Sequence, residues 1–241
     1  LEWKGRALDV LLRREEAIPV LEEALNRATS RAFALHLPRL VFRIGRLLLR
    51  MGRLTGGREY LSRSLQLHRE LKDAPGTLSV LLALAEADGL LARPEAMETW
   101  LTEADPLATQ PEHRERLLLG RVRCLLARDQ FRKALEAAGN PGPGSPVSIA
   151  LALAAAEAAL GCGKAAWARQ KLEKIAPLLA GNDPTLAAGL HFLLARIAAA
   201  ESSRPDPAPL EEAARLFRSC QDFPGLFAAS ALPHLIGPVL A

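Results

Sequence analysis

The sequence predicts an all-α fold: a right-handed superhelical α-solenoid of about six antiparallel helical hairpins plus a C-terminal capping helix. Three observations lead to this prediction. The apolar residues are mainly Leu and Ala, with only 5% aromatic residues, and these two residues favour helices over strands. One pattern of small and large residues recurs along the chain, and turn-forming residues separate the two halves of each copy.

The repeat has a constant period over its first three copies. A small residue lies inside an apolar segment of each copy, and three later positions recur in register with it. The four columns are Gly5, Gly45 and Ala85; Ala17, Gly57 and Met97; Leu21, Leu61 and Leu101; and Ala24, Ser64 and Ala104. Such a register predicts stacked hairpins, because one hairpin alone cannot bury its apolar stripe.

Breaks in the helical pattern lie between the two halves of each of these copies. We expect tight turns around residues 13–15, at residues 52–55 and at the step from Arg93 to Pro94. Pro94 suits the first turn of a new helix, where its missing N–H group costs nothing. Each copy is therefore predicted to be an antiparallel pair of helices.

The fourth copy begins near residue 111, and its small position is either Gly120 or Val122. Its second helix, about residues 130–138, ends at a Gly- and Pro-rich run in residues 139–146 that cannot be helical. This run divides the predicted domains: residues 1–138 hold repeats one to four, and residues 147–241 hold repeats five and six with the C-terminal helix. The run is either a hinge between the two parts or a surface loop.

The last copies follow the pattern less closely. The fifth copy is centred on Ala154 and continues through Gly161 and Ala166, and the sixth starts at Ala195. The segments 73–76 and 222–225 both read Asp, one residue, Pro and Gly, and each follows a predicted second helix. The chain after residue 225 is therefore expected to form a final helix that caps the stack.

Several classes of function are disfavoured by the sequence. It holds no nucleotide-binding glycine loop, nucleophile elbow or metal-ligand spacing of His and Cys, so we expect no enzyme, cofactor or metal site. Three widely spaced cysteines are typical of free thiols in a reducing cytoplasm. No apolar run has the roughly 20 residues of a membrane span. The chain starts without Met inside a predicted helix and is expected to be part of a longer protein.

The first three copies resemble the tetratricopeptide repeat (TPR) family. Ile44, Gly45 and Leu48 fit the first helix of its signature, and Gly57 and Leu61 fit the second. The sequence departs from the family in its longer period, in Leu at most aromatic positions and in the absence of the closing Pro. The resemblance implies a protein–protein interaction module that binds a peptide or helix of its partner in a concave groove lined by first helices.

The long period is also similar to that of helical arms in bacterial multidomain regulators. This likeness implies an alternative function: a sensor or regulatory arm that binds a small ligand or a partner and passes the signal to attached domains. Recognition of RNA is disfavoured, because the recurring positions are small and apolar and aromatic residues for base stacking are few.

Four arginines mark the predicted binding surface. Arg39, Arg43, Arg46 and Arg50 follow one another at spacings of four, three and four, which places them on one helix face. Guanidinium groups bind carboxylates and phosphates bidentately, so this face suits a protein or peptide partner of acidic character. The alternative is a solvated face whose arginines pair with acidic neighbours.

Further residues extend this predicted site. Phe42, Leu49 and Leu82 are expected to face the groove and receive an apolar anchor, unless they pack between helices. The fourth copy adds one of two arginine pairs, and the predicted site includes Arg121. The two pairs are Arg114 with Arg121, and Arg116 with Arg123.

Overall fold

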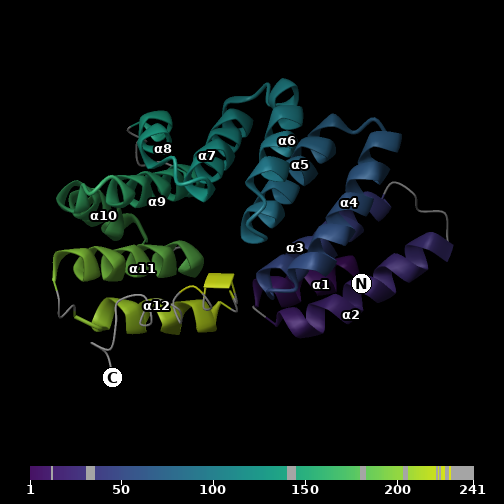
Figure 1. Cartoon of the computed structure of the whole chain (residues 1–241). Helices are drawn as coiled ribbons and strands as arrows, with labels where there is room; N and C mark the ends of the chain where they lie inside the picture. Colours follow the sequence, from purple (N-terminus) through teal and green to yellow (C-terminus); the bar gives the residue numbers. More distant parts are fainter. Residues whose placement is uncertain are drawn as a thin grey trace. The chain divides into compact units, whose positions relative to one another are not determined.

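The computed structural model describes residues 1–11, 13–30, 36–139, 145–179, 183–202, 206–220, 222, 224–225 and 228. These residues form twelve α-helices in six antiparallel hairpins, with no strand among them (Figure 1). The helices are α1 (Glu2–Val10), α2 (Arg14–Ser30), α3 (Leu37–Arg50), α4 (Leu54–Glu70), α5 (Ala74–Leu90), α6 (Pro94–Ala104), α7 (Pro111–Ala127), α8 (Phe131–Ala138), α9 (Pro146–Gly161), α10 (Ala165–Leu179), α11 (Pro184–Glu201) and α12 (Ala208–Ser219). A short 3-10 helix, η2 (Asp105–Leu107), follows α6. The predicted all-α solenoid of six hairpins is confirmed, whereas the predicted capping helix falls largely outside the described residues.

The chain divides into two compact units, Leu1–Leu117 and Leu118–Ala241. The division lies inside α7 and not at the Gly- and Pro-rich run that we predicted to separate the domains. The reason is that α8 shares a core with α9, in which Ala134 and Ala138 pack with Leu151 and Ala155. Residues 140–144, which form most of the predicted hinge, lie outside the described residues.

The predicted register is confirmed in the first unit, where all four columns are buried. The small positions lie where the two helices of a hairpin cross closely. A Cβ added to Gly45 would lie 2.9 Å from Cγ of Leu61 and 3.0 Å from the carbonyl oxygen of Gly57. A Cβ added to Gly5 would lie 2.5 Å from a methyl carbon of Leu21. The small residue of one helix thus receives the large Leu of the other.

The turns share one backbone geometry. An N–H group just beyond a helix bonds to a carbonyl of its last turn, as Arg53 does to Leu48 and Arg93 does to Asp88. The residue before that N–H has a positive φ, which is 73° at Gly52 and 54° at Ala92. This is the left-handed cap that commonly ends α-helices. The same bond ends α7 and α9, so the two helices of these hairpins are joined by very short turns. It also ends α4, where a turn of the same kind leads to the next hairpin.

The structure selects one register in the fourth copy. Val122 is fully buried against Ala134 and Ala138. These alanines follow Val122 at the same spacing at which Gly57 and Leu61 follow Gly45. Gly120 is only partly buried, and the residues twelve and sixteen positions after it, Arg132 and Glu136, are exposed. Val122 is therefore the small position of the fourth copy, and Gly120 is excluded.

The predicted register of the fifth copy is wrong by two positions. Ala156, Ala168 and Leu172 are buried together in one core, whereas Ala166 is exposed. Ala154 is buried, but it packs in the core shared with the fourth hairpin. Because α9 is almost entirely Ala and Leu, its sequence offers little contrast between small and large positions. The small position of the sixth copy, Ala195, is buried as expected.

The two Asp-containing turns match each other in structure as well as in sequence. The carboxylate of Asp73 accepts from the backbone N–H of Gly76 at 3.0 Å, and Asp222 accepts from Gly225 at 3.2 Å. A side chain of the preceding helix lies over each glycine: His68 over Gly76, and Phe217 over Gly225. The second turn therefore repeats the helix-starting cap of α5.

Candidate functional site

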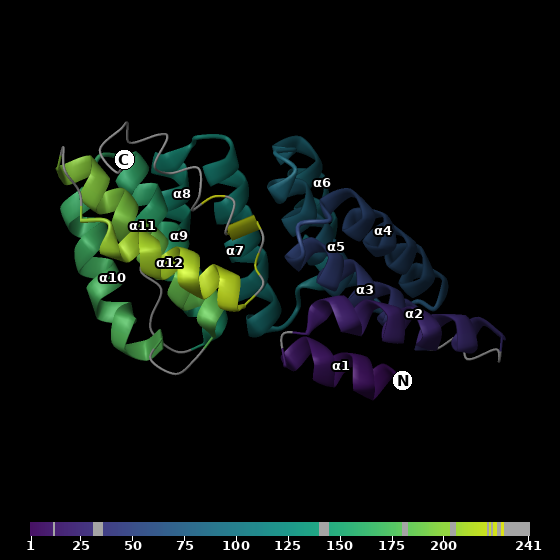
Figure 2. The same ribbon diagram turned by 90° about the horizontal axis from the view of Figure 1, so that it is seen from below.

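The four predicted arginines lie on α3, where three of them meet acidic residues of two neighbouring first helices. A terminal nitrogen of Arg43 lies 3.4 Å from Glu2 of α1, and one of Arg50 lies 3.7 Å from Asp9 of the same helix. Arg46 lies 3.3 Å from Glu86 of α5. These contacts place α1, α3 and α5 along one surface of the first unit, which we name the first-helix face (Figure 2).

These ion pairs are loose. All three separations exceed the 2.7 Å between Arg58 and the buried Asp88, and both partners of each pair remain partly exposed to solvent. Exposed pairs of this kind contribute only about 0–1 kcal/mol. The arginines of the first-helix face are therefore held weakly by their present partners.

The positive charges also crowd one another. Burial lowers the pKa of Arg43, Glu2 raises it, and the nearby charges of Arg6 and Arg39 lower it further. Arg39 is exposed, and the described part of the chain shows no acidic partner within salt-bridge distance of it. An additional anion at this face would relieve this repulsion.

The apolar residues predicted for the site differ in accessibility. Phe42 and Leu82 are partly exposed. Leu49 is only 3% exposed, because its side chain packs against Gly57 of α4. The prediction that Leu49 receives an apolar anchor is therefore wrong, and the packing alternative holds for this residue.

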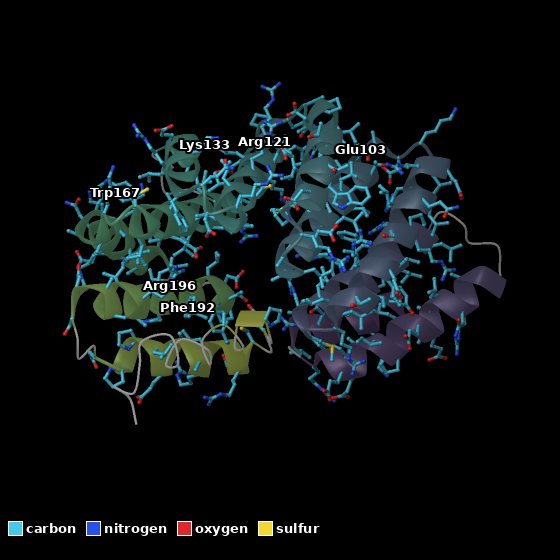
Figure 3. All side chains as sticks on the ribbon, viewed as in Figure 1. Glu103, Arg121, Lys133, Trp167, Phe192 and Arg196 are labelled. Atoms are coloured by element: carbon cyan, nitrogen blue, oxygen red, sulfur yellow. The ribbon has the colours of Figure 1, made fainter. Side chains whose placement is uncertain are left out.

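The register of the fourth copy also decides between the two arginine pairs. With Val122 in the place of Gly45, the position of Arg46 falls on Arg123 and that of Arg39 on Arg116. Arg121 is exposed on α7, but it occupies the position of Ile44 (Figure 3). The prediction that Arg121 belongs to the site is therefore wrong. The pair Arg116 and Arg123 occupies the positions that Arg39 and Arg46 have in the second copy.

A charged column that the sequence reasoning missed follows from the corrected register. The residue after each small position is charged in all six copies. These residues are Arg6, Arg46, Glu86, Arg123, Glu157 and Arg196. Each unit contains one pair of opposite charges from this column: Arg46 lies 3.3 Å from Glu86, and Glu157 lies 2.5 Å from Arg196. The signal was present in the sequence, but it became readable only once the registers of the fourth and fifth copies were known.

The second unit presents its own part of this column. Arg196 of α11 lies 5.9 Å from the ring centroid of Phe192 and pairs with Glu157 of α9 (Figure 3). This pair is tighter than those around α3, since its donor and acceptor atoms are in hydrogen-bond contact. The arginines of α3 therefore have the looser intramolecular pairs to exchange for a new anionic partner.

A buried carboxylate anchors the first unit away from this surface. Asp88 of α5 is fully buried, and it accepts from Nε of Arg58 at 2.7 Å and from the indole N–H of Trp100 at 2.8 Å. These donors come from α4 and α6, so the carboxylate connects three helices. Both of its oxygens have hydrogen-bond donors, which is the condition for keeping a charge buried. We assign this cluster a structural role.

The described residues show neither a metal site nor a membrane span. No cluster of three or more His, Cys, Asp or Glu residues is placed to hold a metal ion there. The three cysteines form no disulfide with one another, and two are buried and one is partly exposed. Of the helices described, none combines the length and the apolar character needed to cross a membrane.

Comparisons with known proteins identify the fold. The sequence matches no family model and no curated protein. The structure is similar to "phAimR-Ligand", with a TM-score of 0.67 at 12% identity over 83% of this chain and 54% of that chain. It is also similar to a tetratricopeptide repeat protein from Parabacteroides merdae, with a TM-score of 0.46 at 15% identity over 98% and 94% of the two chains.

The fold is an all-α solenoid of stacked helical hairpins, as the sequence pattern predicted, and it is shared with the phAimR structure. This chain spans about half the length of the phAimR chain that it matches. At such low identity the similarity concerns the fold alone. The binding properties of this chain must therefore be argued from its own residues.

Proposed function

We propose that the chain is a non-enzymatic TPR-like module that binds a protein or peptide partner through the first-helix face of its first unit. The observation that carries this proposal is the row of four arginines on α3, three of which are only loosely paired. Phe42 and Leu82, both partly exposed, supply apolar contacts at the same face. The three free thiols are typical of a reducing compartment, which favours the cytoplasm.

An acidic partner suits this face because it can replace the intramolecular pairs. Each loose contact costs little to break, whereas a carboxylate held bidentately by Arg gains two charge-assisted hydrogen bonds. Arg39 needs no such exchange, since it is exposed. The expected partner therefore carries several Asp or Glu residues in a short segment.

The proposal is tested by charge reversal. Affinity capture from a cell lysate, read by mass spectrometry, would compare the wild-type module with the Arg43→Glu/Arg46→Glu variant. A matched control is Arg53→Glu/Arg63→Glu, which changes the same charge near the start of α4 and within it, where both residues are exposed. We expect a captured protein that the α3 variant loses and the α4 variant retains.

The alternative outcomes are distinct. If both variants capture the same proteins as the wild type, the arginines are a solvated surface and the proposed site is wrong. If the α4 variant loses the partner equally, the binding depends on net charge and has no site on α3. If the expected result is found, the purified partner must also bind the purified wild-type module, because capture from a lysate can be indirect.

A sensor arm for a small ligand is the second candidate. The similarity to a structure described as ligand-bound phAimR supports considering it. Thermal-shift screening of the purified module against small molecules separates the two functions. A ligand that raises the Tm, with no protein captured, favours the sensor arm.

A further inference from the structure

An apolar stripe lies on α1 beside the arginines. Trp3, Arg6 and Val10 are spaced by three and four residues, so they share one helix face. Trp3 is 76% exposed and Val10 is 81% exposed, values that are unusual for such residues. The guanidinium carbon of Arg6 lies 4.6 Å from the ring centroid of Trp3, a cation–π distance.

The repeat register places this stripe on the first-helix face. The equivalent positions in the second copy are those of three α3 arginines. The pairs are Trp3 with Arg43, Arg6 with Arg46, and Val10 with Arg50. The contacts of Glu2 with Arg43 and of Asp9 with Arg50 show that residues of the two helices meet at this face. The electrostatic effect of Arg6 on Arg43 agrees with this placement.

Trp3 and Val10 differ from the exposed residues of the first hairpin whose equivalents lie in the apolar core between hairpins. Two other exposed residues, Leu1 and Leu11, are equivalent to Val41 and Met51, which the second copy buries against the preceding hairpin. The equivalents of Trp3 and Val10 are Arg43 and Arg50, whose side chains contact Glu2 and Asp9 of the preceding hairpin and remain 22% and 47% exposed. Trp3 and Val10 therefore lie on the first-helix face and outside the apolar core between hairpins.

The charge around this stripe is positive. The first-helix face carries five arginines and three acidic residues on α1, α3 and α5. They are Arg6, Arg39, Arg43, Arg46 and Arg50, and Glu2, Asp9 and Glu86. The arginines and the exposed Trp3 and Val10 lie on the same face. A complementary partner therefore carries negative charge next to a large apolar group.

We propose that the partner is an acidic protein segment with a large apolar side chain, which Trp3 and Val10 receive while its carboxylates pair with the α3 arginines. This inference rests on the proposed function and names the chemistry of the partner. A tryptophan at an interface is a typical energetic anchor, since its ring buries a large area at low entropic cost. The flanking arginines then set the specificity for acidic residues.

The test is a selection from a random library of short peptides displayed on phage. Three baits would be compared: the wild-type module, Trp3→Ser/Val10→Ser and Arg43→Glu/Arg46→Glu. The control bait is Trp167→Ser, which removes a partly exposed tryptophan of α10 in the other unit (Figure 3). Circular dichroism must first show that each variant keeps the helicity and the Tm of the wild type.

We expect peptides selected by the wild type to be rich in Asp and Glu around one aromatic or large aliphatic residue. In fluorescence anisotropy, their affinity should fall about tenfold or more with Trp3→Ser/Val10→Ser, the scale of one interface hot spot. Affinity should be unchanged with Trp167→Ser. A peptide whose apolar residue is replaced by Ser should bind the wild type and the Trp3/Val10 variant equally.

Other results would overturn the inference in different ways. If acidic peptides bind the Trp3/Val10 variant as well as the wild type, Trp3 and Val10 do not receive an apolar side chain. The proposed function would still stand. No enriched peptide, or peptides insensitive to the Arg43/Arg46 variant, would contradict both proposals. A dimer of the wild-type module that Trp3→Ser/Val10→Ser abolishes would identify a second copy as the occupant. If the wild-type module binds a random oligonucleotide more tightly than any selected peptide, the ligand of this face is a nucleic acid and not a peptide.

Discussion

The glycine at position 45 is required by the close crossing of α3 and α4. A Cβ there meets Leu61 and the backbone of Gly57, and backbone cannot move aside as a flexible side chain can. We expect Gly45→Ala to lower the free energy of unfolding by about 1–3 kcal/mol through overpacking. Gly56 is the matched control, because the nearest atom to its added Cβ is 3.9 Å away.

Gly56→Ala should be neutral or stabilise the protein by up to about 1 kcal/mol, since Ala is the better helix former. Urea unfolding followed by circular dichroism measures both variants. Equal effects of the two substitutions would contradict the close crossing of the helices at Gly45.

The buried Asp88 makes a second prediction at the residue scale. Removing Arg58 leaves a buried carboxylate without its closest cation, so Arg58→Met should cost about 3 kcal/mol or more. Arg93 lies 4.0 Å from the same carboxylate and is largely exposed, so Arg93→Met should change stability by less than about 1 kcal/mol. Thermal unfolding read by tryptophan fluorescence, to which Trp100 contributes, distinguishes the two. A larger effect of Arg93→Met would show that the cluster is assigned incorrectly.

At the scale of the elements, the turns hold residues in a backbone conformation that they disfavour. Ala92 and Asp129 have φ of 54° and 55° at positions that Gly52 and Gly163 occupy in other copies. A non-glycine residue in the left-handed region costs about 1–2 kcal/mol, part of which is offset by the lower entropy of its unfolded chain. Ala92→Gly should therefore raise the free energy of unfolding by about 0.5–1 kcal/mol.

The reverse substitution, Gly52→Ala, should lower the free energy of unfolding by a similar amount. Urea titrations of both variants measure the difference. If Ala92→Gly destabilises the protein, the left-handed cap does not end α5 as the structure shows.

The hairpins of the first unit could be predicted because Gly and Ala stand out among large residues at one period. The fifth copy could not, because alanines fill α9 and every register fits equally well. Leu49 was misplaced because its burial depends on Gly57, a contact between two helices that one helix pattern does not contain. The acidic partners of the α3 arginines lie on neighbouring copies, and only the packed hairpins bring them into contact.

At the scale of the whole molecule, the main helix–helix contacts within each unit are between neighbours in sequence, such as α3 with α4 and α11 with α12, as in a repeat stack. A local defect should then weaken its own hairpin and the adjacent ones more than distant hairpins. We expect Gly45→Ala to increase amide hydrogen exchange in α3, α4 and α5 and to leave α10 to α12 near wild type. Hydrogen–deuterium exchange with mass spectrometry measures this, and a uniform loss of protection would indicate one cooperative unit.

The central claim, that a partner binds the first-helix face, is tested most directly by site-specific photocrosslinking. A photoreactive phenylalanine analogue would replace Phe42 on this face or, as a control, the exposed Glu59 of α4. We predict a crosslinked partner from position 42 that disappears with Arg43→Glu/Arg46→Glu, and no such product from position 59. Crosslinking of the same partner from position 59 alone would contradict the claim and place the interaction on the second helices.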